Sequence, residues 1–328
     1  MTLRSAYDRE ILRLAVPALG ALAAEPLYVL VDTAVVGHLG RSQLAALGVA
    51  ATVFSALAMF NFLQYGTTAQ TARALGAGEH DTAAQFGVQT LWLSLGFGLA
   101  LATVIAGFAR PIVHLVGAHG VTADYAVTYV RIVAIGVPSA FLTLGGQGFL
   151  RGVSDLRTPL VFVVAGNAAN VVLEVVFVYG FDWNIRGSAW GTAIAQTGMG
   201  VGIAWAILRR VGRARLAFRW DLARRLLSIG KYIFARTVAL LSSFVLAGAV
   251  VARLGDAPLA AHQIAFQLWI FLALVLDAIA IAGQIIVGRE LGAGRAEAAY
   301  AASARMIDRK STRLNSSHIQ KSRMPSSA

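Results

Sequence analysis

The sequence contains no cysteine and little charge. Without cysteine, neither a disulfide framework nor a thiolate metal site can form. Only 13% of the 328 residues are charged and 57% are hydrophobic, whereas a soluble globular chain is about 25% charged. No Gly-Lys phosphate loop, nucleophile-base pair or zinc motif is present. We therefore expect neither an enzyme nor an ATP-driven pump, and no cofactor.

Long apolar runs follow one another along nearly the whole chain. A helix needs about 20 apolar residues to cross a bilayer, and several runs exceed that length without turn signals. A barrel strand would need only about 9 to 11 residues and would alternate polar with apolar positions. We therefore predict an all-α polytopic membrane protein. The eight predicted spans are 11–37, 44–75, 84–109, 122–150, 159–180, 187–208, 225–254 and 258–288.

The formal net charge of +12 indicates membrane topology rather than nucleic-acid binding, because most arginines lie at the ends of apolar runs. With a cytoplasmic N-terminus, the inside segments hold most of the arginines, including seven in 209–225. Only four lie in the outside loops: Arg41, Arg110, Arg186 and Arg253. This bias predicts an inside N-terminus. Scarce lysine beside abundant arginine and alanine suggests a bacterial chain, so the expected membrane is the plasma membrane, that is, the bacterial inner membrane. The basic loop could also bind anionic lipid headgroups.

The chain repeats itself at a fixed interval. The segment Val36–Ala46 recurs as Val251–Ala261, and Arg73-Ala-Leu-Gly-Ala-Gly78 recurs as Arg289-Glu-Leu-Gly-Ala-Gly294. The two matches have nearly the same offset, which indicates duplication. Six spans fit into the period, so both copies enter the membrane from the same side. This is the parallel plan of some secondary transporters.

The second copy is shorter than the first, because it contains two spans instead of six. We expect an N-terminal six-helix lobe over 1–222 and an incomplete C-terminal lobe over 223–307. The composition changes abruptly at Asp308, and two of the three lysines lie beyond it. The segment 308–328 is therefore interpreted as a non-native tail, with a disordered basic tail as the alternative.

An acid lies within the first span. Asp32 and Glu25 are seven residues apart, which places them on one face of a straight helix. Pro26 lies between them, so a kink is expected there. Charge at mid-membrane costs roughly 2.5 to 3.5 kcal/mol on insertion scales and persists where it meets a cavity, a partner or a transported ion. Asp32 is thus a candidate functional residue.

The fifth span carries a polar face. Asn167, Asn170 and Glu174 stand at i, i+3 and i+7, so all three share one side of the helix. Asparagines alone could serve as hydrogen-bonding contacts between membrane helices. The carboxylate of Glu174 favours an ion or proton site instead, because a buried acid without function is costly.

These motifs resemble those of one transporter family. Asn167-Ala-Ala-Asn-Val-Val-Leu-Glu174, followed by Val-Val-Phe-Val-Tyr-Gly180, is similar to the fifth-helix motif of multidrug and toxic compound extrusion (MATE) transporters. Gly187-Ser-Ala-Trp-Gly-Thr-Ala193 resembles the start of their sixth helix, and Gly152–Pro159 resembles the preceding loop. Within the family the similarity is to the DinF-like branch, with Asp32 in the first helix and Asp277 in the eighth.

The resemblance implies a six-plus-six helix fold, of which about eight helices are present, and cation-coupled export of drug-like or toxic organic compounds. It implies a cation site of Asp32, Asn170, Glu174 and Thr192. The family often has aspartate at position 174, and the extra methylene of glutamate keeps the charge but shifts its oxygens. We therefore expect H⁺ coupling rather than Na⁺, and no metal besides Na⁺. The expected partners are a cationic or hydrophobic small molecule and membrane lipid, with no nucleic acid, for a monomeric protein.

Further polar side chains inside the spans are expected to line a central cavity: Glu25, Asn61, Gln64, Asn167, Asp277 and Gln284. Arg131 and Arg236 are either counter-ions to the acids or snorkel to the membrane interface. Two other functions stay open. A lipid-linked precursor flippase would need more basic residues in its cavity, and a fragment lacking four spans would not transport.

Overall fold

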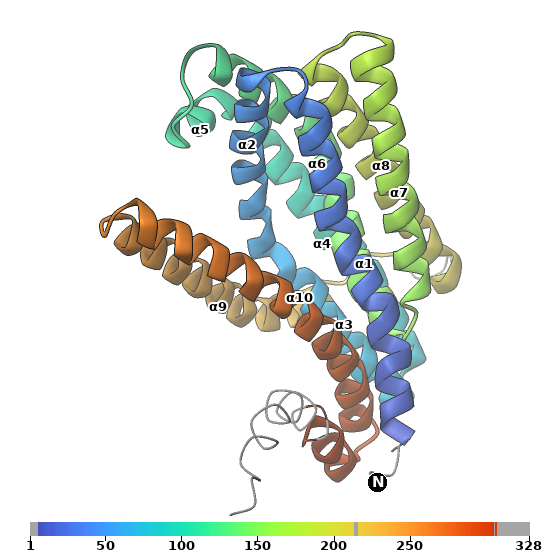
Figure 1. Ribbon diagram of the computed structural model, residues 1–328. Coiled ribbons are helices and arrows are strands. Elements are labelled where there is room, and N and C mark those ends of the chain that lie inside the picture. Colours follow the sequence, from blue (N-terminus) through green and yellow to red (C-terminus); the bar gives the residue numbers. More distant parts are fainter. Residues whose placement is uncertain (1–5, 213–215, 305, 307–328) are drawn as a thin grey trace, which may run out of the picture.

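The computed structural model describes residues 6–212, 216–304 and 306, and Figure 1 shows that they form a helical protein. The helices are α1 (Ala6–Gly37), α2 (Arg41–Ser55), α3 (Phe62–Gly76), α4 (His80–Gly107), α5 (Ala109–Leu115), α6 (Gly120–Gly152), α7 (Arg157–Val175), α8 (Ile185–Val211), α9 (Trp220–Ala252) and α10 (Asp256–Gly292). Within these residues, eight helical segments are long and apolar enough to cross a membrane, which confirms the predicted number of spans.

Two of the spans contain short non-α segments. The predicted second span consists of α2, a 3-10 segment (Ala56–Asn61) and α3. The fifth span is α7 followed by a π-helical turn (Val176–Gly180). Helix α1 continues through both of its prolines, Pro17 and Pro26. The periodicity of the sequence does not predict either the 3-10 segment or the π-helical turn. Such segments often mark functional positions in helices.

Helices α1 to α8 form an upright bundle, and α9 and α10 form a hairpin that leans away from it (Figure 1). Helix α6 is central, because it packs against α2, α3, α4 and α8. Small residues permit this close packing: a Cβ atom on Gly200 of α8 would overlap the backbone of Ser139 on α6. Close approach of small residues is a main source of helix association in membranes. The bundle therefore forms a tight frame around its polar residues.

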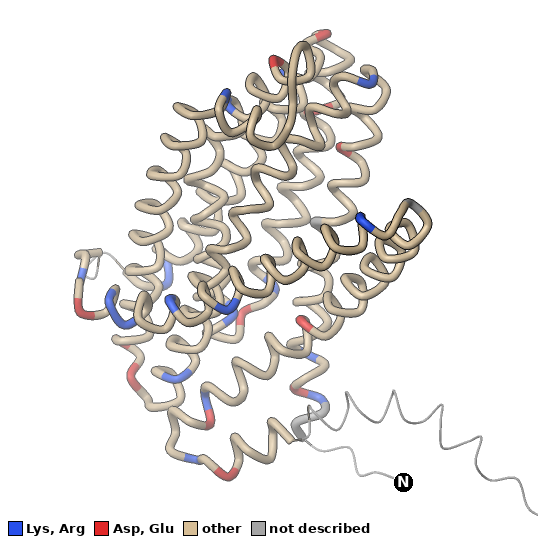
Figure 2. The backbone as a smooth tube through the Cα atoms, turned by 90° about the vertical axis from the view of Figure 1, so that its left-hand side faces the viewer, with Lys and Arg blue, Asp and Glu red and all other residues tan. Residues whose placement is uncertain are grey.

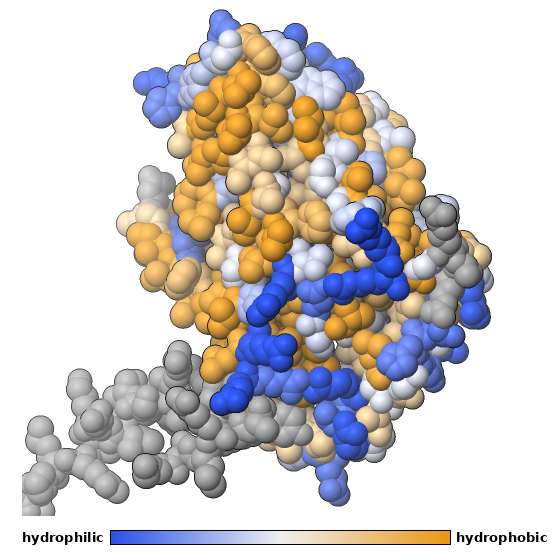
Figure 3. Space-filling model, turned by 90° about the vertical axis from the view of Figure 1, so that its right-hand side faces the viewer, coloured by the Kyte–Doolittle hydropathy of each residue, from blue (hydrophilic) through white to orange (hydrophobic). Residues whose placement is uncertain are grey.

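The surface has the pattern expected of a membrane protein. Figure 2 shows that most charged residues lie near helix ends and connecting turns. The face in Figure 3 presents broad hydrophobic areas above a dense hydrophilic patch. Large apolar side chains such as Leu115, Val245 and Phe271 are exposed on the helices. Hydrocarbon can cover such surfaces without cost, whereas water cannot.

The duplicated motifs contact each other. Helices α3 and α10 cross at Ala72 and Gly76 on one side and at Gly288 and Gly292 on the other. A Cβ on Gly76 would overlap the carbonyl oxygen of Arg289, and a Cβ on Gly292 would overlap that of Arg73. Positions with the same place in the repeat thus face one another. The small residues at four-residue spacing let the two backbones approach closely.

This crossing predicts a packing defect when its glycine is enlarged. We expect Gly76→Ala to lower the free energy of unfolding by about 1–3 kcal/mol, because a backbone carbonyl must move to admit the methyl group. Thermal unfolding of the detergent-purified protein measures the change. Gly96→Ala is the matched control, because no atom lies within 4 Å of its added Cβ. If the two variants melted alike, the crossing would not be tightly packed.

Some predictions fall outside these observations. The segment 308–328 lies beyond the described residues, as does the side chain of Glu25. The boundaries of the two lobes stay predictions. Below, "the bundle" means α1 to α8 and "the hairpin" means α9 and α10.

Candidate functional site

Three helices bring the predicted cation-site residues together in the bundle. Asp32 comes from α1, Asn170 and Glu174 from α7, and Thr192 from α8. All four side chains are buried, with exposed fractions of 6%, 3%, 0% and 6% respectively. Gly191 permits this approach, because a Cβ there would lie 3.2 Å from the backbone nitrogen of Glu174. The residues matched to the family motif thus form one cluster, which we call the acidic site.

Hydrogen bonds fix part of the acidic site. The Ser188 hydroxyl donates to Oδ1 of Asp32 at 2.9 Å. The amide nitrogen of Asn170 donates to Oγ1 of Thr192 at 3.4 Å, and the Tyr28 hydroxyl lies 3.1 Å from the same oxygen. Asp32 is therefore held by a serine hydroxyl, and the neighbouring Thr192 by an amide and a phenol.

Three oxygens of the acidic site have no donor. Both carboxyl oxygens of Glu174 and the amide oxygen of Asn170 are buried without a hydrogen-bond partner among the described residues. The carboxyl groups of Glu174 and Asp32 lie within hydrogen-bonding reach of each other. Unpaired buried acceptors are costly, and two neighbouring carboxylates repel. A proton shared by the acids, or a cation bound among these oxygens, would remove both costs.

The donor set is suited to a hard cation or a proton. Carboxylate, amide and hydroxyl oxygens are the ligands that such cations prefer. Two acids side by side can also hold one proton between them. The acidic site can therefore change its charge, which is the property needed to couple ion binding to a change in conformation.

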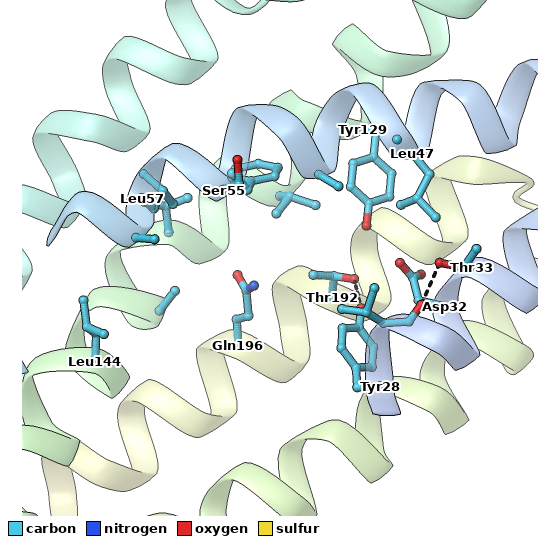
Figure 4. Close-up of a pocket in the computed structure, with 18 of the residues that line it drawn as sticks. Tyr28, Asp32, Thr33, Leu47, Ser55, Leu57, Tyr129, Leu144, Thr192 and Gln196 are labelled. Atoms are coloured by element: carbon cyan, nitrogen blue, oxygen red, sulfur yellow. Dashed lines mark hydrogen bonds between the residues drawn. The ribbon is translucent and has the colours of Figure 1, made fainter. Parts of the chain in front are cut away.

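A cavity of about 600 Å³ adjoins the acidic site inside the bundle. We call it the bundle cavity. Figure 4 shows Tyr28, Asp32, Tyr129 and Thr192 gathered at one end of it, with Gln196 farther along. Most of the remaining lining is apolar, from residues such as Leu47, Phe54, Val133 and Phe141. Such a cavity is suited to a small organic molecule with an apolar body.

A second cavity, of about 360 Å³, is lined by residues of the bundle and by Asp277 of the hairpin. We call it the junction pocket. Four of the predicted cavity residues line it: Asn61, Gln64, Asn167 and Asp277. Asn61 also lines the bundle cavity, whereas Gln284 lines neither of the two. Tyr28, Asn61 and Gln196 belong to both linings, so the cavities adjoin.

Sequence reasoning missed several residues of these sites. Tyr28 and Ser188 each stand four residues before a predicted ligand on the same helix, Asp32 and Thr192 respectively. That spacing places each pair on one helix face and could have revealed them.

Arg151 directly follows the predicted span 122–150. The structure places it in the last turn of α6, buried at 4% exposure in the lining of the junction pocket. The two arginines considered as counter-ions, Arg131 and Arg236, are exposed. Arg131 donates to the backbone oxygen of Ala106. The buried basic group near the cavities is thus Arg151.

Comparisons with known proteins agree on one family. The MatE family model matches residues 17–176 and 233–307. The chain is 33% identical to "Protein DETOXIFICATION 44, chloroplastic" of Arabidopsis thaliana, over 87% of the chain and 57% of that protein. It is 32% identical to "DNA damage-inducible protein F" of Escherichia coli (strain K12), over 89% of the chain and 66% of that protein. It thus spans about three fifths of these relatives' length.

The fold has close structural relatives. The crystal structure titled "MATE in the bent conformation" superposes with a TM-score of 0.86 at 23% identity. The superposition covers 93% of this chain and 70% of that one. At this identity the likeness concerns the arrangement of the helices.

Proposed function

Because this chain belongs to the MATE family of membrane transporters, as its motifs indicate, we propose that it takes part in cation-coupled export of drug-like or toxic organic compounds. Members of the family are transporters, not enzymes. The proposed membrane is the bacterial inner membrane, with the N-terminus in the cytoplasm, and the proposed state is monomeric.

One observation supports this proposal above the others. Glu174 is fully buried beside Asp32, and neither of its oxygens accepts a hydrogen bond from the described residues. Such a pair needs a proton or a cation for its own stability. The pair also adjoins a cavity large enough for an organic molecule. Binding of a proton or cation to the acids and binding of an organic molecule in the cavity can therefore influence each other.

Protons are the proposed coupling ion. Two carboxyl groups within hydrogen-bonding reach can share one proton directly, whereas Na⁺ needs several oxygens arranged around it. The hydroxyl oxygens of Thr192 and Ser188 already take part in hydrogen bonds, which leaves the amide oxygen of Asn170 as the neutral oxygen of the acidic site without a donor among the described residues. A proton fits this arrangement without moving them.

The lining of the bundle cavity favours an organic compound over a lipid pyrophosphate. No arginine or lysine lines it. Phosphate groups are recognised mainly by such cations. The flippase alternative therefore has less support than drug export.

The coupling ion can be tested in membrane vesicles containing the protein, with ethidium as the fluorescent substrate. We expect a pH gradient to drive ethidium movement and an equal Na⁺ gradient at constant pH to have no effect. Fluorescence of the dye measures movement, and vesicles without the protein give the background. Movement driven by Na⁺ alone would contradict proton coupling.

A further inference from the structure

The junction pocket has opposite charges on two of its walls. Arg151 stands at the end of α6 in the bundle, and Asp277 stands on α10 in the hairpin. Both line the pocket, and each influences the other electrostatically. They nevertheless form no ion pair within the described part of the chain. The pocket therefore carries both signs of charge without an ion pair between them, and Arg236, which does not line it, also acts electrostatically on Asp277.

Each charge has only neutral hydrogen-bond partners. The guanidinium of Arg151 donates to Oε1 of Gln147 at 3.1 Å. The Tyr65 hydroxyl lies 3.4 Å from each carboxyl oxygen of Asp277. A guanidinium has five N–H donors, and this is the one hydrogen bond that the described residues give to that of Arg151. Most of its donors are therefore free for a ligand.

Burial makes the charge of Arg151 significant. Arg151 is 4% exposed, and an arginine keeps its charge in such surroundings. A buried charge without an opposite partner is strongly unfavourable. An opposite charge carried by a ligand would compensate that cost. Asp277, in the same lining, is half-buried, so its carboxylate can also be reached by a ligand in the pocket.

We propose that the junction pocket binds a zwitterionic organic molecule, with its carboxylate on Arg151 and its protonated amine on Asp277. A simple cation would be repelled by Arg151, and a simple anion would be repelled by Asp277. Only a molecule carrying both charges satisfies both walls. Apolar side chains between them, including Leu144, Val163 and Met199, provide contacts for a compact hydrophobic body.

Such a ligand would connect the two parts of the molecule, because its carboxylate contacts the bundle and its amine contacts the hairpin. It would stabilise the arrangement in which they lie close together. A role of this ligand in export rests on the proposed function. The preference of the junction pocket for a zwitterion does not rest on it. Binding can be measured without any ion gradient, so failure of coupling at the acidic site would leave the preference unchanged.

Three matched probes test the proposal: 4-(aminomethyl)benzoic acid, its methyl ester and its N-acetyl derivative. The first is a zwitterion, the second a cation and the third an anion. We expect the purified protein to bind the zwitterion at least about tenfold more tightly than either derivative, as for the loss of one charged hydrogen bond. Isothermal titration calorimetry or saturation-transfer NMR measures the three affinities.

Two variants assign the charges. Arg151→Gln should remove the advantage of the zwitterion over its ester, and Asp277→Asn should remove its advantage over the N-acetyl compound. Arg151→Lys keeps the positive charge and should retain the wild-type order of affinities for the three probes. It therefore distinguishes loss of the charge from a defect in folding. Arg131→Gln, at an exposed position, is the matched control. A wild-type protein that binds the ester best, or an unchanged ranking in both neutral variants, would overturn the proposal.

Discussion

Replacing Glu174 with glutamine should strongly reduce gradient-driven export. Glutamine has almost the same size, so the packing around this fully buried position is retained. It cannot take up or release a proton, so the charge of the acidic site no longer changes fully with the ion gradient. A ligand can shift a conformational equilibrium only by as much as it binds the two states unequally. We expect export to fall about 5- to 150-fold, the range of coupling free energies of about 1–3 kcal/mol.

The measurement is ethidium export from vesicles under a fixed pH gradient, normalised to the amount of protein in the membrane. Glu174→Asp is the matched control, because it keeps an ionisable carboxyl group beside Asp32. We expect it to retain part of the activity. Binding of ethidium without a gradient should be similar in both variants, since Glu174 does not line the bundle cavity. Full export by Glu174→Gln would exclude this acid from coupling.

The helical fold could be predicted almost completely from sequence. Apolar runs longer than a bilayer crossing allow only one kind of structure, because backbone polar groups in lipid must be satisfied within the segment. The limits of the spans follow from glycines, arginines and prolines at their ends. The 3-10 segment before α3 could not be predicted, since its residues, Ala56–Asn61, are as apolar as their neighbours. Tertiary packing determines such local changes of helix type.

The acidic site could be predicted only in part from the sequence. Spacing along α7 places Asn170 and Glu174 on one face, but nothing in spacing links that face to Asp32, about 140 positions earlier. That link came from the resemblance to a family. Ser188 gave no signal by itself, because a serine in a membrane helix often bonds its own backbone. Its contact with Asp32 required the relative rotation of α1 and α8.

The burial of Arg151 could not be predicted from the sequence, for a physical reason. An arginine near the end of an apolar run is usually a topology determinant, and its long side chain usually reaches the interface. At this position α6 lies in the centre of the bundle, so neighbouring helices surround the side chain. Sequence shows where a helix ends but not how many helices surround that end.

Cross-linking α3 to α10 should stop export reversibly. Export through two alternating shapes requires the bundle and the hairpin to separate where they now touch, since the hairpin already leans away elsewhere (Figure 1). Ala72 and Gly288 face each other at this contact, and a Cβ on Gly288 would lie 3.1 Å from that of Ala72. A disulfide joins Cβ atoms about 3.5–4.5 Å apart. Ala72→Cys with Gly288→Cys should therefore form a bond after a small adjustment.

The absence of native cysteine makes this test specific, because no other thiol can react. Oxidation of the double variant should reduce ethidium export to background, and dithiothreitol should restore it. Ser94→Cys with Gly145→Cys is the matched control: a Cβ on Gly145 would lie 3.5 Å from that of Ser94, and both helices belong to the bundle. Because that Cβ would also lie 2.7 Å from the methyl group of Thr90, export of the oxidised pair is compared with that of its reduced form. Oxidation of this pair should leave export unchanged, because α4 and α6 move together. If oxidised Ala72→Cys/Gly288→Cys still exported at the reduced rate, the contact between the repeats would not have to open during transport.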